Sequence, residues 1–136
     1  FLARLTVTRP VTDTVALLRG LGLPPPVHVL TVTDGLGELL GPGFVEIKAW
    51  QEGALDLQRV LRQRHVDVIV NMEPGRHSFV LRDPYWLVVQ MSPREAGFVR
   101  VPVPGSDHVG VYLRRELAER LGAPTAAEPP ADRPRR

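Results

Sequence analysis

The segment VDVIVN, residues 66–71, constrains the fold more than any other part of the chain. It is a nearly continuous run of apolar, β-branched residues, which predicts a strand buried on both faces of a parallel sheet. An amphipathic helix is expected just before it, over 54–64, with Leu57, Val60 and Leu61 on the inner face. A helix followed at once by a fully buried strand is typical of α/β architecture.

Further strands and helices are expected along the rest of the chain in alternation. This predicts an α/β fold with a mostly parallel central sheet of five to six strands flanked by helices. A hairpin between the last two strands would make the sheet mixed. The other expected strands are 3–8, 27–32, 44–49 (near an edge), 85–91 and 98–103, and the other expected helices start at Thr12 or Asp13, at Leu36, and at Ser106 or Asp107.

The organisation expected from length and composition is one domain over 1–122, because 136 residues suit a single domain. Residues 123–136 are rich in Pro and Ala and are expected to be disordered. The first residue is Phe1 rather than Met, so a piece of a longer polypeptide stays open, as does a homo-oligomer.

The charge and residue usage narrow the class of function. The formal net charge is only +2, and the fifteen acidic residues are interspersed with the basic ones, so no nucleic-acid partner is expected. The absence of Cys excludes thiolate nucleophiles and thiolate metal sites. No apolar run reaches the ~18 residues of a membrane span, and a cytoplasmic protein without a membrane partner is expected.

Polar groups gather where two of the expected strands end. Thr33, Asp34 and Gly35 follow the strand 27–32, while Asn71, Gly75 and Arg76 follow the strand 66–71. Ligands of parallel sheets bind beyond the carboxyl ends of the strands, and an arginine with backbone N–H groups suits an anion. Helix capping by Thr33 or Asp34 and a solvated surface Arg76 are the alternatives.

Catalytic groups are harder to identify. Glu73 and Asp83 each precede a proline, and His77 adjoins the same loop, so these three are the candidates for a general base. An acidic residue before a proline is also common in loops and turns without any catalytic role, which explains Glu73 and Asp83 equally well. The sequence has no HExxH, GxSxG, GxxxxGK[ST] or GxGxxG motif, and neither a cofactor nor a metal is expected.

The order of these residues resembles the methylglyoxal-synthase-like domain, in particular the carboxy-terminal allosteric domain of carbamoyl phosphate synthetase large subunits. Glu52-Gly53, a helix, the strand ending at Asn71, and Gly75-Arg76 follow that pattern, and the 33–35 loop falls at the family's phosphate loop. The family's lysine before Glu-Gly is matched by Lys48, one place off, and Leu36 replaces a phosphate-loop threonine.

The resemblance implies a regulatory domain of nucleotide metabolism. Its ligand would be an anionic or phosphorylated metabolite or a nucleotide, bound by residues 33–35, Lys48, Glu52-Gly53, Asn71 and Gly75-Arg76. Two other functions stay open. One is a methylglyoxal-synthase-type phosphate lyase using Glu73 or Asp83, and the other is a structural or interaction domain of a larger assembly.

Overall fold

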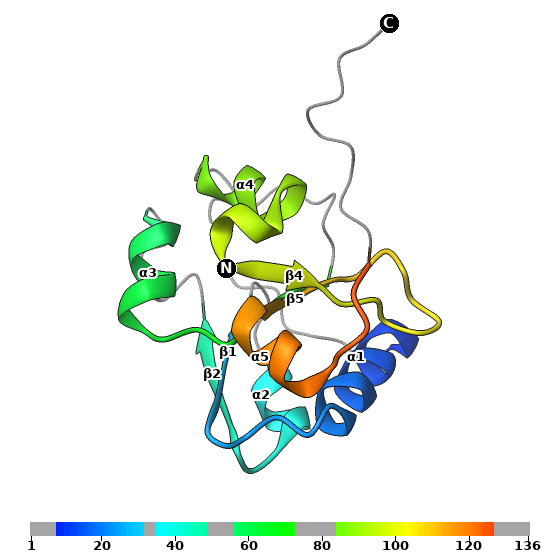
Figure 1. Cartoon of the computed structure of the whole chain (residues 1–136). Helices are drawn as coiled ribbons and strands as arrows, with labels where there is room; N and C mark the ends of the chain where they lie inside the picture. The colour runs from blue at the N-terminus through cyan, green and yellow to red at the C-terminus, as the bar shows by residue number, and fades with distance from the viewer. Residues whose placement is uncertain (1–7, 32–34, 49–55, 73–83, 127–136) are drawn as a thin grey trace, which may run out of the picture.

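The computed structural model describes residues 8–31, 35–48, 56–72 and 84–126. Most of the strand expected over 3–8 and residues 127–136 of the expected tail lie outside these ranges. In the described part, helices cover both faces of one central sheet (Figure 1). The α/β class predicted from the sequence is therefore confirmed.

The sheet has five strands in the order β2-β1-β3-β5-β4, so it is mixed. β1 lies between β2 and β3 and is parallel to both, whereas β5 is antiparallel to β3 and to β4. As expected for the alternating segment 44–49, β2 is an edge strand. The strands are β1 Val27–Thr31, β2 Phe44–Lys48, β3 Val68–Asn71, β4 Phe98–Arg100 and β5 Gly110–Arg114.

The helices form two layers, each with its own apolar core. α1, α2 and α5 pack on one face and α3 and α4 on the other. β3 serves both cores, because Val68 and Val70 belong to the first and Ile69 to the second, each at most 1% exposed. The helices are α1 Arg9–Gly20, α2 Leu36–Leu40, α3 Leu57–Gln63, α4 Tyr85–Met91, the 3-10 helix η3 Pro93–Ala96, and α5 Arg115–Leu121.

Residues 85–91, expected to be a strand, form the helix α4, and the expectation was wrong. Trp86 and Val89, three residues apart, are buried, while Leu87 and Met91 are 61% and 41% exposed. This burial has a helical period, although the aromatic and β-branched composition favours a strand. Packing of one face on the α3/α4 core has overridden the local preference.

The helix expected to begin at Ser106 or Asp107 was also wrong, since 110–114 is a strand and the helix begins at Arg115. A spacing of four, as in Val109 and Leu113, fits a strand as well as a helix, because it is two strand periods. Val109, Val111 and Leu113 are all buried in the core of the α1 side. β5 is also the partner of β4, so the hairpin considered between 85–91 and 98–103 does not form.

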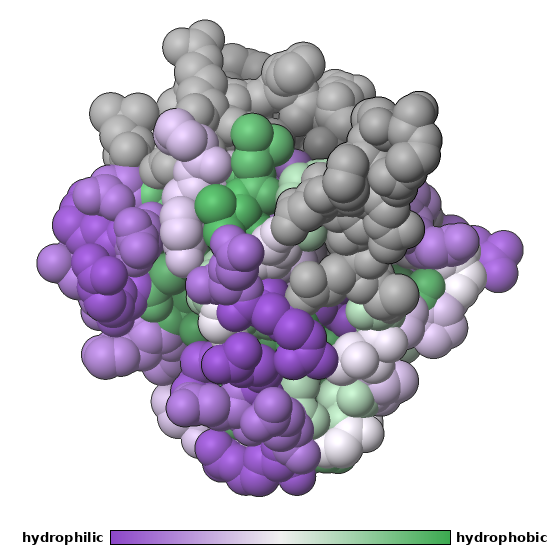
Figure 2. All heavy atoms as spheres, turned by 45° about the horizontal axis from the view of Figure 1, so that its top comes forward, coloured by the Kyte–Doolittle hydropathy of each residue, from purple (hydrophilic) through white to green (hydrophobic). Residues whose placement is uncertain are grey.

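Four large apolar side chains in the described part of the chain are exposed, and two of them, Leu87 and Met91, belong to α4. Figure 2 shows a few apolar side chains within a largely hydrophilic face. Two exposed side chains on α4 are too few to define a docking surface. No helix among the described residues is long and apolar enough to cross a membrane.

Candidate functional site

The carboxyl ends of β2, β1 and β3 lie side by side, because the three strands are parallel neighbours. Thr31 at the end of β1 is in register with Lys48 of β2 on one side and with Val70 of β3 on the other. Asn71 follows Val70 and is buried, at 2% exposed. The structure therefore brings the ends of the strands at Thr31 and Asn71 together, as the sequence predicted, and the predicted residue Lys48 ends the strand on the other side of β1.

The loop after β1 leads into α2 through Gly35. Gly35 has a φ of 108°, in the left-handed region that glycine adopts without strain, and it is the N-cap of α2. The backbone N–H groups expected to bind an anion at this loop are partly used by a carboxylate of the protein itself. The Gly37 N–H donates to Glu46 Oε1 at 3.1 Å, and the Thr31 hydroxyl donates to Glu46 Oε2 at 2.7 Å.

Glu46 was missed by reasoning from the sequence. It points to the α2 side of the edge strand β2, where its carboxylate links β1, β2 and the first turn of α2. A glutamate between Val45 and Ile47 in a strand has a solvated side chain as its ordinary interpretation. The close approach of Gly37, whose added Cβ would lie 2.7 Å from Glu46 Cβ, could not be read from the sequence.

The remaining predicted residues lie outside the described part of the chain. Among the predicted ligand-binding residues these are Thr33, Asp34, Glu52, Gly53, Gly75 and Arg76, and among the catalytic candidates they are Glu73, His77 and Asp83. Their roles, and with them the lyase alternative, stay predictions.

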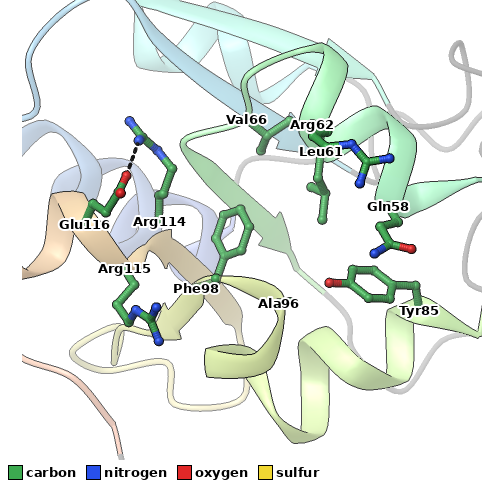
Figure 3. A pocket seen from close by; sticks show the side chains of 11 residues that line it. Gln58, Leu61, Arg62, Val66, Tyr85, Ala96, Phe98, Arg114, Arg115 and Glu116 are labelled. Atoms are coloured by element: carbon green, nitrogen blue, oxygen red, sulfur yellow. Dashed lines mark hydrogen bonds and ion pairs between the residues drawn. The ribbon is translucent and has the colours of Figure 1, made fainter.

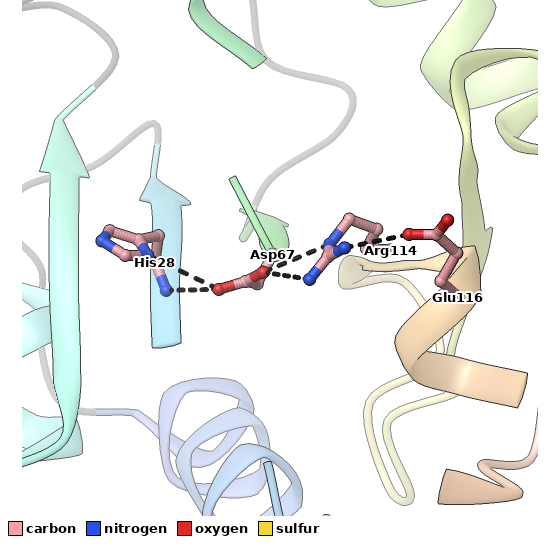
Figure 4. Close-up of polar contacts among 4 residues, drawn as sticks. All are labelled: His28, Asp67, Arg114 and Glu116. Atoms are coloured by element: carbon pink, nitrogen blue, oxygen red, sulfur yellow. Dashed lines mark hydrogen bonds and ion pairs between the residues drawn. The ribbon is translucent and has the colours of Figure 1, made fainter. Parts of the chain in front are cut away.

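A continuous polar network lies at the other end of the strands, where β1 and β3 begin (Figure 4). Asp67 directly precedes β3, and its Oδ1 accepts hydrogen bonds from Arg114 Nε at 3.2 Å and Nη2 at 2.8 Å. Its Oδ2 accepts from the backbone N–H of His28 at 3.0 Å, and the His28 ring Nδ1 lies 3.6 Å from the same oxygen. Arg114 Nη1 in turn donates to Glu116 Oε1 at 3.1 Å.

This network ties three adjacent strands together at their ends. Asp67 also exchanges backbone hydrogen bonds with its neighbours, since its N–H donates to His28 O and its carbonyl accepts from Arg114 N–H, both at 2.8 Å. The carboxylate is largely buried but compensated by a guanidinium, as a buried charge must be. Residue 114 was expected within a helix, so the pair with Asp67 could not be predicted.

A pocket with a volume of about 370 Å³ opens beside this network, on the α3/α4 side of the sheet (Figure 3). Its apolar wall includes Leu61, Val66 and Phe98, and its polar lining includes Arg62 and Arg115. The volume falls in the range of small-molecule sites. Its lining comes from α3, α4, η3, β4, β5 and α5, so no single sequence motif announces it.

One titratable group in the core has a shifted pKa. Burial raises the pKa of the Tyr112 hydroxyl above its ordinary value of 10.0, and the positive charge of Arg100 partly offsets this. Tyr112 lies in the middle of β5 and packs in the α3/α4 core. In the described ranges, no group of three or more His, Asp or Glu side chains could hold a metal ion.

Comparisons with protein-family models, with curated proteins and with solved structures gave no match for this chain. The functional assignment therefore depends on the geometry of the chain itself.

Proposed function

We propose that the chain is a small-molecule-binding domain whose ligand is an anionic metabolite, a phosphorylated compound or a nucleotide. The ligand would bind beyond the carboxyl ends of β2, β1 and β3, the usual position in sheets with parallel strands. The resemblance to methylglyoxal-synthase-like domains favours the same class of ligand and a regulatory rather than a catalytic role.

The row of strand ends at Lys48, Thr31 and Asn71 is the observation that carries this proposal. Lys48 and the buried amide side chain of Asn71 lie at the carboxyl ends of β2 and β3, the two strands on either side of β1. Glu46 already accepts from the Gly37 N–H and the Thr31 hydroxyl, so the anion would depend on Lys48 and on the predicted Arg76.

A binding screen tests the proposal, with inorganic phosphate, a pentose phosphate and nucleoside monophosphates as probes. We expect at least one probe to raise the melting temperature, since a ligand of the native state stabilises it by mass action. Lys48→Gln and Arg76→Ala should each weaken its binding by about tenfold. Arg19→Gln, which removes an exposed cation from α1, serves as the matched control.

Two results would contradict the proposal. One is the absence of stabilisation by every anion in the series. The other is an affinity that Lys48→Gln and Arg76→Ala change no more than Arg19→Gln does.

A further inference from the structure

The pocket beside the Asp67–Arg114 network has the features of a second, separate ligand site. We infer that it binds a small aromatic anion, with the anionic group at Arg62 and Gln58 and the ring against Phe98. This pocket shares no described residue with the carboxyl ends of β2, β1 and β3, where the proposed function places its ligand. The inference is therefore independent of that proposal.

The polar end of the pocket is built by α3. Gln58 and Arg62 are four residues apart on this helix, so their side chains project from the same face. Both line the pocket, and Figure 3 shows them on the same side of it as the hydroxyl-bearing ring of Tyr85. A guanidinium beside a side-chain amide offers several N–H donors to a carboxylate or phosphate group.

The charges of the pocket leave Arg62 available for a ligand. Arg114 also lines the pocket, but its guanidinium is held by Asp67 and Glu116. Arg62 and Arg115 form no ion pair with any residue in the described ranges. The described part of the lining therefore has an excess of positive charge, which attracts anions and disfavours cations.

The apolar surface between Arg62 and Arg115 indicates that the ligand also carries an aromatic ring. Figure 3 places Phe98 between Arg62 and Arg115, with Leu61 and Val66 nearby. Phe98 and Val66 are 4% and 2% exposed, so they form the fixed base of the pocket, and the half-buried Leu61 and Tyr85 offer more apolar surface to a ligand. Aromatic rings pack well on such a surface, in offset or edge-to-face arrangements with Phe98 and Tyr85. Inorganic phosphate lacks a group to fill this space.

A titration followed by NMR tests the inference, with phenyl phosphate and benzoate as probes. Inorganic phosphate lacks the ring and benzyl alcohol lacks the charge, so these two serve as matched controls. We expect at least one aromatic anion to bind at least tenfold more tightly than either control, with shifts centred on the amides of Gly97 and Phe98. Comparison of the two probes shows whether phosphate or carboxylate is preferred.

Variants then locate the anionic group. Arg62→Gln should weaken binding by about tenfold, and Arg115→Gln, which acts at longer range, by about twofold. Arg59→Gln removes the same charge from the same helix at a residue outside the pocket lining and should change the affinity by less than about twofold. Lys48→Gln at the carboxyl end of β2 should leave it unchanged.

Three outcomes would overturn the inference. The first is equal affinity for phenyl phosphate, benzoate and the two controls. The second is an equal effect of Arg62→Gln and Arg59→Gln, which would show a non-specific charge effect. The third is a set of shifts centred on Gly35 instead of Gly97 and Phe98, which would place the ligand at the carboxyl ends of β2, β1 and β3.

Discussion

Two carboxylates, Asp67 and Glu46, link neighbouring strands of the sheet, but they are stabilised differently. Asp67 at the amino ends of β1 and β3 is paired with the guanidinium of Arg114 and with a strand amide. Glu46 lies in the middle of β2, and its carboxylate accepts from the Thr31 hydroxyl at the end of β1 and from the Gly37 amide. Among the described residues no cation pairs with it.

This difference gives the two carboxylates different expected roles, one in holding strands together and one in setting the affinity for an anion. The charge of Asp67 is balanced by that of Arg114, and their network joins β1, β3 and β5. The neighbouring pocket therefore has a rigid side. Among the described residues no cation compensates the negative charge of Glu46, so it opposes the anion that the strand ends are proposed to bind. Asp67 is expected to matter for folding, and Glu46 for both folding and affinity.

The largest effect is expected from Asp67→Ala. The change leaves the His28 N–H and the Nε and Nη2 groups of Arg114 without their acceptor, while Nη1 keeps Glu116. It should lower the free energy of unfolding by about 2–3 kcal/mol. The figure is discounted because the Arg114 side chain is 38% exposed. Urea denaturation measures it.

Asp56→Ala is the control for that variant. Asp56 caps α3 by accepting from the Arg59 N–H, and its loss should cost only about 1 kcal/mol. Equal losses in the two variants would show that the Asp67 network adds nothing beyond an ordinary hydrogen bond.

Gly37→Ala tests how tightly Glu46 fits the start of α2. The new Cβ would lie 2.7 Å from Glu46 Cβ, so β2 or α2 must shift, and a loss of about 1–2 kcal/mol is expected. Gly20→Ala in α1 is the matched control, because a Cβ there meets nothing within 4 Å. Thermal unfolding of both proteins measures the difference, and a Gly37→Ala protein as stable as Gly20→Ala would refute the close contact.

Glu46→Gln separates the charge of Glu46 from its shape. The amide keeps one acceptor but loses the charge, so the stability should fall by about 0.5–1 kcal/mol. Affinity for the best phosphate probe should rise by about twofold to fivefold, because a negative charge near the proposed site is removed. Isothermal titration measures this, and a weaker affinity would mean that Glu46 itself contacts the ligand.

Tyr112→Phe is expected to have the smallest effect, and only in alkali. A raised pKa in the folded protein means that the stability is complete below the unfolded value of 10.0 and is lost as the pH rises through the folded value. Tyr112→Phe should therefore lose less stability than the parent between about pH 9 and pH 11. Urea midpoints across that range check it, and parallel curves for the two proteins would contradict it.

The sequence predicts the segment 27–71 well, whereas the first helix begins at Arg9 and not at Thr12 or Asp13 as expected. The strands at 27–31, 44–48 and 68–71 and the helices at 36–40 and 57–63 lie within the expected segments. The second half was mispredicted where composition and period disagree. In α4 the composition favours a strand, and in β5 the spacing of four is shared by strand and helix.

The candidate sites could be predicted only in part. The adjacency of the strand ends at Thr31 and Asn71 follows from the parallel pattern, and it was found. The pair of Asp67 with Arg114, 47 residues apart, depends on the direction of β5, which no local signal gives. The pocket has the same dependence, since Arg114 and Arg115 reach it only because β5 runs antiparallel to β3.

The lining of this pocket is contributed by segments that begin at Gln58 in α3 and end at Glu116 in α5. A molecule seated there would act as a non-covalent crosslink between early and late parts of the chain. Its occupancy would therefore resist global denaturation rather than local fraying, and the urea midpoint of the whole domain would report how much of the compound is bound.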